Sequence, residues 1–296
     1  MRSRWIVNLI LLALIAGIVS FLYLRPAKPV EEKKSQQVIA VSNLKIGGFS
    51  HVSIEFPAKA GVEFEKIDGY WHIVKPFKAR ADQMAVQRIL AIVAAESNDK
   101  FPATDLARYG LDQPKIKVKL DNEEFLFGTY NPVSSDQYLA YKDAVYLVSS
   151  SYSDFASVQV EEAIDKNLLK PTEKVAGFDF SRLEQWESVR LNVDIKDGNW
   201  TTSVPDAKLT QNDMNEWFDT YWKNVDIKSV EPYTPDRRAT YASFEVKLQD
   251  GSKVHFDRIQ EAPEVILGRP DEGMMYHLPA DFGFTLLNPP VTAKSK

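Results

Sequence analysis

The 296-residue sequence predicts an α+β fold, with one N-terminal transmembrane helix followed by two tandem, duplicated α+β units whose sheets are mostly antiparallel. Three observations predict it. A long apolar run stands near the start of the chain. Alternating apolar and polar residues, interrupted by Asp-Gly pairs, are typical of strands joined by tight turns. The same order of strand, turn and helix patterns then occurs twice.

The apolar run extends from Trp5 to Leu24, and Asn8 and Ser20 are its only clearly polar members. At a rise of 1.5 Å per residue a helix of this length spans about 30 Å, the thickness of a bilayer core. We therefore predict a single membrane-spanning helix over residues 5–24. No cysteine is present to carry a lipid anchor at this end.

The charges that flank this run give only a small bias, since Arg2 and Arg4 precede it and Arg25 follows it. Because most of the chain lies on the C-terminal side, we expect the N-terminus inside and the C-terminus outside the cytoplasm. The alternative is a cleaved signal peptide, which has a shorter apolar stretch and a small-x-small cleavage site. Residues 21–24, Phe-Leu-Tyr-Leu, occupy the place of such a site, so the sequence favours a retained anchor.

Composition excludes several classes of function. The absence of cysteine excludes disulfides, zinc-thiolate sites, iron–sulfur clusters and cysteine nucleophiles. The formal net charge is −5, and the part beyond residue 34 is more acidic still because the first residues are rich in lysine and arginine. An acidic surface argues against binding of nucleic acid and of anionic lipid headgroups.

The stretch from Arg25 to Gln37 combines two prolines with mixed charges and few apolar residues, which is the composition of a linker. The predicted divisions are a cytoplasmic tail (1–4), the transmembrane helix (5–24), the linker (25–43), a first α+β repeat (44–172), a second α+β repeat (173–288) and a flexible tail (289–296).

The predicted duplication rests on landmarks that recur at an offset near 130 residues. Asp68-Gly69 precedes Trp71 in the first copy, and Asp197-Gly198 precedes Trp200 in the second. Asp-Gly suits the positive φ angles of a two-residue hairpin turn. Later alternating runs, around Val118 and Val246, predict further strand pairs in each copy.

One helix is predicted in each copy after the first hairpin. Asp82 caps the first helix and Thr210 caps the second. The apolar residues that follow have the spacing of a helix that buries one face; they are Val86, Ile89, Leu90 and Val93 in the first copy, and Met214, Trp217, Phe218 and Tyr221 in the second. The segment from Tyr152 to Leu169 is predicted to be a further helix, ended by Pro171.

The segment Asp105 to Pro114, with its Tyr109-Gly110-Leu111 run, resembles the bacterial family called domain of unknown function 4340. Phe127-Gly128 and the run from Tyr146 to Val148 add to the resemblance, which is strongest in the first copy. The resemblance implies a single-pass protein of the bacterial inner membrane with its C-terminal domain in the periplasm. It also implies envelope proteins as partners, ABC transporter components among them. The family supplies no catalytic residues to carry over.

No motif of catalysis is found, and we expect no catalytic, cofactor-binding or metal-binding residues and no enzymatic activity. The four histidines, His51, His72, His255 and His277, are scattered and are expected to be half-buried strand residues rather than ligands. The carboxylates at 121–124 and 271–272 are expected to be solvated at hairpin tips. A pair of carboxylates facing each other in space, as in a glycosidase, stays open because sequence does not show separation.

The tryptophans are expected to pack in the core, with one exception. Trp222 lies one residue off the apolar stripe of its helix, so an exposed ring there would be a possible contact for a partner. The leading hypothesis is a non-enzymatic accessory or protein-interaction module of an envelope transport or assembly complex. The alternative is a glycan- or lipid-binding module that uses the cleft between the two repeats.

Overall fold

The computed structural model describes residues 12–21 and 38–292, and it separates into two units, Met1–Ile39 and Ala40–Lys296. In the first unit, residues 12–21 form a helix. The remainder of the predicted transmembrane helix, residues 5–11 and 22–24, lies outside the described residues, as do the predicted tail (1–4) and most of the linker. Within the part that is described, no helix has the length and apolarity needed to cross a membrane.

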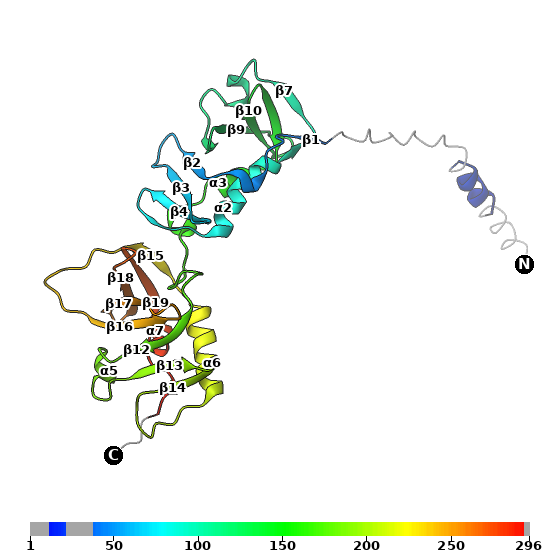
Figure 1. Cartoon of the computed structure of the whole chain (residues 1–296). Coiled ribbons are helices and arrows are strands. Elements are labelled where there is room, and N and C mark those ends of the chain that lie inside the picture. The colour runs from blue at the N-terminus through cyan, green and yellow to red at the C-terminus, as the bar shows by residue number, and fades with distance from the viewer. Residues whose placement is uncertain (1–11, 22–37, 293–296) are drawn as a thin grey trace, which may run out of the picture. The chain divides into compact units, whose positions relative to one another are not determined.

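The second unit contains two large antiparallel sheets, of nine and eight strands, and Figure 1 shows many of their strands. The first sheet follows the order β5-β4-β3-β2-β8-β9-β10-β11-β7. Its strands are β2 (His51–Glu55), β3 (Val62–Ile67), β4 (Tyr70–Lys75), β5 (Ala79–Arg80), β7 (Lys100–Pro102), β8 (Ile116–Leu120), β9 (Glu123–Tyr130), β10 (Gln137–Tyr141) and β11 (Ala144–Val148). Two short strands, β1 (Ile39–Ala40) and β6 (Glu96–Ser97), form a separate two-stranded sheet.

The second sheet follows the order β14-β13-β12-β16-β17-β18-β19-β15. Its strands are β12 (Val175–Asp179), β13 (Asn192–Lys196), β14 (Asn199–Thr202), β15 (Ser229–Pro232), β16 (Ala242–Leu248), β17 (Lys253–Gln260), β18 (Glu264–Arg269) and β19 (Met274–Pro279). Apart from the edge strand β5, the two orders correspond strand by strand. The predicted α+β class with mostly antiparallel sheets is confirmed.

Helices accompany each sheet. The part of the chain before β12, which contains the first sheet, is called the first half, and the part from β12 onward the second half. The helices of the first half are α2 (Gln83–Leu90), α3 (Ser151–Ala156) and α4 (Val160–Ala163), and its short 3₁₀ turns are η1 (Ile46–Gly48), η2 (Ala91–Ala94) and η3 (Ala107–Tyr109). In the second half they are α5 (Glu184–Glu187), α6 (Gln211–Phe218), the π-helical turn η4 (Asp219–Lys223) and α7 (Ala280–Leu287). Helix α2 packs against β4, and α6 packs against β14.

The predicted turns and caps are found where the sequence places them. Asp68 and Gly69 have φ of 51° and 86°, and Asp197 and Gly198 have φ of 51° and 78°, so both hairpins have two central residues with positive φ. The Asp82 carboxylate accepts hydrogen bonds from two backbone N–H groups of α2. The Thr210 hydroxyl accepts one from the N–H of Asp213.

Three boundaries differ from the prediction. The segment from Tyr152 to Leu169, predicted as one helix, contains two short helices, α3 and α4. The helix is interrupted because the backbone of Gln159 has an extended conformation (φ −74°, ψ 150°). The end of the predicted linker packs on the domain, since Val41 is buried and its N–H donates to Ala95. The start of the predicted flexible tail is also fixed, because Thr292 exchanges two backbone hydrogen bonds with Lys208.

The core of the second half is dominated by aromatic rings. Phe178 in β12 is fully buried, and its ring centroid lies 4.5 Å from that of Trp222 and 5.3 Å from that of Trp217. Trp200 packs on the same ring. Trp71 and Trp200, which follow the two Asp-Gly turns, are both buried as the sequence predicts.

Candidate functional site

Residues 149–174, between β11 and β12, form the connecting segment between the two sheets. A cluster of charged side chains lies where this segment meets both sheets, and its centre is the fully buried Arg269 at the end of β18. The Arg269 guanidinium donates to both Glu173 oxygens, at 2.5 and 3.0 Å, and to both Asp271 oxygens, at 3.0 and 3.1 Å. It also donates to the backbone oxygen of Leu168 at 2.7 Å. All its donating nitrogens are therefore held by the protein.

Arg80 at the end of β5 is the second arginine of this cluster and comes from the first sheet. Its Nη1 donates to Asp165 at 2.5 Å and its Nε donates to Glu272 at 3.2 Å. Its Nη2 donates to the Tyr276 hydroxyl at 3.2 Å and to the backbone oxygen of Asn167. Arg80 thus joins strand β5 to the turn that follows β18, although Arg80 and Glu272 are 192 residues apart in the sequence.

We name the set Arg80, Asp165, Lys170, Glu173, Arg269, Asp271, Glu272 and Tyr276 the junction cluster. Burial by itself lowers the pKa of Arg80, but its neighbours Tyr276, Glu272 and Asp165 raise that pKa above its usual value. Burial also opposes the charge of Arg269, yet hydrogen bonds to Glu173 and Asp271 raise its pKa. Both guanidinium groups are therefore stabilised in their charged form.

The junction cluster corrects one expectation. The sequence pattern predicts that Asp271 and Glu272 are solvated at a hairpin tip. This holds for Asp271, whose side chain is 52% exposed, but only 10% of the Glu272 side chain is exposed. The Tyr276 hydroxyl donates to its carboxylate at 3.0 Å. The signal that sequence reasoning missed is Arg269 itself, an arginine at the end of the apolar run Val-Ile-Leu-Gly, because a charge in such a run needs a buried partner.

Asp271 predicts a dependence of stability on acid. Burial raises the pKa of Asp271, but hydrogen bonds from Arg269 outweigh this and hold the pKa below the usual 3.8. A carboxylate with a lowered folded-state pKa stabilises the fold above its unfolded-state pKa, and this contribution is lost as pH falls through the folded-state value. We expect wild type to have a higher urea midpoint than Asp271→Asn at pH 5–7 and this difference to shrink below pH 3.8. A difference that is constant with pH would contradict the assignment.

The histidines are half-buried residues of strands, as expected. His277 in β19 lies between two carboxylates, with Nδ1 2.8 Å from Glu264 and Nε2 2.8 Å from Glu231. His255 in β17 lies 3.0 Å from Asp257. In the described part of the chain, no group of three or more His, Asp and Glu residues is arranged to hold a metal ion.

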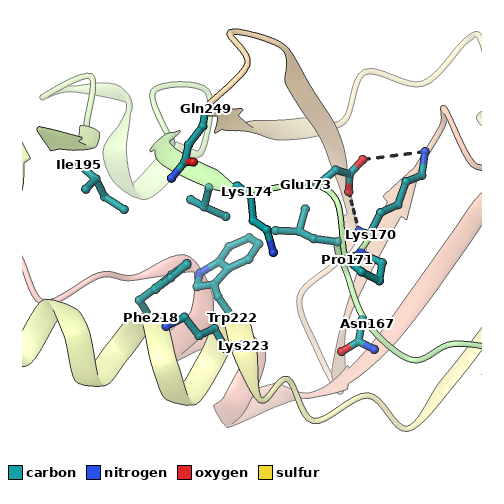
Figure 2. A pocket seen from close by; sticks show the side chains of 12 residues that line it. Asn167, Lys170, Pro171, Glu173, Lys174, Ile195, Phe218, Trp222, Lys223 and Gln249 are labelled. Atoms are coloured by element: carbon teal, nitrogen blue, oxygen red, sulfur yellow. Dashed lines mark hydrogen bonds and ion pairs between the residues drawn. The ribbon is translucent and has the colours of Figure 1, made fainter. Parts of the chain in front are cut away.

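Trp222 in η4 is placed differently from the expectation of an exposed ring, since only 5% of it is accessible. The π-helical turn shifts the register of the helix end and rotates this ring inward onto Phe178. Its role as a contact for a partner stays a prediction. The ring lines a pocket of about 580 Å³ together with residues of the connecting segment, and Figure 2 shows this pocket.

The Tyr109-Gly110-Leu111 run forms a compact unit against β9. Tyr109 stacks on Phe101 at 5.7 Å and lies 4.8 Å from the ring of Tyr138. Gly110 has φ of 65° and ends the turn η3. A methyl group at Gly128 in β9 would overlap the backbone oxygen of Tyr109 and lie 2.9 Å from the Leu111 side chain. The motif and Gly128 are thus parts of one close contact.

This contact gives a prediction. Gly128→Ala is expected to lower the free energy of unfolding by about 1–3 kcal/mol, because the added methyl meets backbone that cannot rotate away. The measurement is urea unfolding followed by circular dichroism. Gly47→Ala, whose methyl group would meet nothing within 4 Å, is the control and is expected to change stability by less than about 0.5 kcal/mol. Equal stability of both variants would contradict the tight packing of the motif.

Comparison with protein families identifies one family whose model matches this chain. A model of the family described as "Domain of unknown function (DUF4340)" matches residues 71–254, which is more than half of the chain. The chain belongs to this family. The DUF4340 match begins at Trp71 in β4 and ends at Val254 in β17, so it includes the Tyr-Gly-Leu run and parts of both sheets. No curated protein and no solved structure matches the chain.

The family match confirms the resemblance predicted from the sequence, and it includes residues of both sheets. It covers Arg80, Asp165 and Glu173 of the junction cluster, whereas Arg269 lies beyond its end. It also covers Trp222 and the rest of the pocket that this ring lines. Both candidate sites of this DUF4340 protein therefore overlap the matched region.

Proposed function

We propose that this DUF4340 protein is a non-enzymatic accessory of an envelope transport or assembly complex. In this proposal residues 5–24 anchor it in the bacterial inner membrane and its C-terminal domain faces the periplasm. Its partners are envelope proteins, ABC transporter components among them. The apolar run of the sequence supports the anchor.

The junction cluster is the observation that carries the proposal. An enzyme or carrier that closes on its substrate commonly bends at a hinge of a few loop residues. Here the connecting segment is instead held through its backbone, because the carbonyl oxygens of Asn167 and Leu169 accept from Arg80 and that of Leu168 accepts from Arg269. A rigid arrangement of two sheets suits a platform on which other proteins assemble.

The carboxylates of the junction cluster also favour binding over hydrolysis. Acid–base catalysis of the glycosidase type needs a carboxylate pair that faces a substrate. Glu173, Asp271 and Glu272 are each paired with Arg269. Their charges are already compensated by the protein.

We also propose that the two halves are copies of one unit. The strand orders of the two sheets correspond from β4 to β7 and from β14 to β15. The Asp-Gly hairpin turn, the buried tryptophan after it and the capped helix recur in the same order. In the second copy, no Tyr-Gly-Leu run is present.

Affinity purification tests the accessory role. Tagged full-length protein is crosslinked mildly in the native host, purified, and analysed by mass spectrometry beside a variant without residues 1–24. We expect the full-length protein to recover a reproducible set of envelope membrane proteins and the shortened variant to recover few of them. Recovery of no membrane protein with the full-length chain would contradict the proposal.

A substitution in the junction cluster tests whether the fixed arrangement of the two sheets is needed for partner binding. Arg80→Met breaks the ion pairs of β5 with Asp165 and Glu272 and leaves the anchor intact. If the fixed arrangement of the sheets matters, this variant loses the same partners. Arg238→Met, whose side chain is 91% exposed, is the matched control and keeps them.

The second candidate function, binding of a glycan or lipid between the repeats, has one observation in its favour. The pocket beside Trp222 combines aromatic walls with a few polar groups, which is typical of a ligand site. Its lining comes from the connecting segment and the second half only, in contrast to the predicted cleft between the repeats.

A further inference from the structure

The pocket beside Trp222 has an apolar wall and a basic rim. The wall is formed by Val175, Ile195, Phe218 and Trp222, from β12, β13, α6 and η4. Three lysines, Lys170, Lys174 and Lys223, stand in the same lining (Figure 2). The volume of about 580 Å³ lies in the range of pockets for small molecules.

The indole N–H of Trp222 is the unusual feature of this wall. It is buried, and among the described residues no group accepts a hydrogen bond from it. The other tryptophans of the second half each have an acceptor, namely Leu287 for Trp186, Asn215 for Trp200 and Thr285 for Trp217. A buried donor without an acceptor costs stability, so its retention calls for an explanation such as a ligand.

The lysines of the rim differ in what they already bind. Lys223 pairs with Asp219 at 2.6 Å, and Lys170 lies 3.5 Å from Glu272. Lys174 has no ion pair within the described structure, and its side chain is exposed at the pocket. The single carboxylate in the lining, that of Glu173, is held by Arg269. The pocket thus has one uncommitted cation and one uncommitted N–H donor.

We infer that this pocket binds a small anion in which a carboxylate or phosphate group is joined to an apolar body. The anion pairs with Lys174, an oxygen of the ligand accepts from the Trp222 N–H, and the apolar body packs on Phe218 and Ile195. This site is independent of the accessory role proposed above. It gives the second candidate function a defined place and ligand chemistry.

Calorimetric titration of the full-length protein in phosphatidylcholine nanodiscs tests the inference. Three probes separate charge from apolar contact: naphthalene-2-carboxylate has both, inorganic phosphate has only the charge, and naphthalene-2-methanol has only the apolar body. We expect saturable binding of the carboxylate and at least tenfold weaker binding of the other two. Equal binding of the alcohol, or of phosphate, would overturn the inference.

Variants assign the binding to the pocket. Lys174→Gln is expected to weaken binding of the carboxylate at least tenfold, and Trp222→Phe, which removes only the N–H donor and part of the ring, about fivefold. Lys78→Gln changes an exposed lysine of the first half and is expected to bind as wild type does. Unchanged affinity in Lys174→Gln, or an equal loss in Lys78→Gln, would overturn the site. The titration contains no partner protein, so its result does not depend on the result of the affinity purification. A failure of the ligand site can therefore be told apart from a failure of the accessory role.

Competition distinguishes two sources of the same chemistry. Displacement of naphthalene-2-carboxylate by dihexanoyl phosphatidic acid supports the site and assigns the anion to a lipid headgroup. Displacement by soluble aromatic acids alone supports the site and assigns it to a small metabolite. Displacement by high sodium chloride alone would show non-specific ion pairing and overturn the inference.

Discussion

Arg269→Met is expected to lower the free energy of unfolding by about 3–5 kcal/mol, because it breaks a buried network of ion pairs by removing its central charge. The guanidinium of Arg269 is fully buried and is paired with Glu173, Asp271 and Glu272. Its removal leaves Glu173, whose side chain is 12% exposed, without its closest countercharge. Urea unfolding at pH 7, followed by tryptophan fluorescence and by circular dichroism, measures the change.

The matched control for this prediction is Arg238→Met. Arg238 also forms an ion pair, with Asp236, but its side chain is 91% exposed, and exposed pairs contribute about 0–1 kcal/mol. Both substitutions remove one paired arginine charge, so the difference between their losses of unfolding free energy reports the effect of burial. If Arg269→Met were as stable as wild type, the junction cluster would not hold the sheets together, and the platform proposed above would lose its basis.

Phe178→Ala is expected to cost about 3–5 kcal/mol of unfolding free energy, because it leaves a cavity in a closely packed core. Phe178 has no exposed surface, and the rings of Phe180, Trp200, Trp217 and Trp222 surround it. The variant should also change the tryptophan fluorescence of the native state. Thermal and urea unfolding of the purified protein give both quantities.

The control for the core is Phe284→Ala on helix α7. This ring is 60% exposed, so its truncation removes little buried surface and is expected to change stability by less than about 1 kcal/mol. A similar loss from both variants would mean that the measured destabilisation does not depend on burial. It would then argue against the aromatic core described for the second half.

The local features of this protein could be predicted from its sequence. The Asp-Gly turns require only two neighbouring residues that tolerate positive φ, and the caps at Asp82 and Thr210 require only a side chain next to its own helix. The α+β class follows from apolar periodicity of the same short range. These interactions join residues close in the chain, so a sequence pattern contains them directly.

Trp222 shows where such a pattern fails. Helical periodicity places this ring beside the buried stripe only if the α-helix is regular throughout. The chain instead widens into a π-helical turn from Asp219 to Lys223, and this change of register buries the ring beside a pocket. The buried ring packs on Phe178 in β12, which lies far from Trp222 in the chain, so a local pattern does not contain this contact.

The sequence by itself determined the fold class, the positions of the hairpins and helix caps, the core role of most tryptophans and the family resemblance. Only the tertiary structure decided the candidate sites. Arg80 and Glu272 are separated by 192 residues, and their ion pair forms because β5 and the turn after β18 are brought together by the fold. A charge in a sequence does not show whether a partner will be buried with it, since that depends on distance in space and on loss of water.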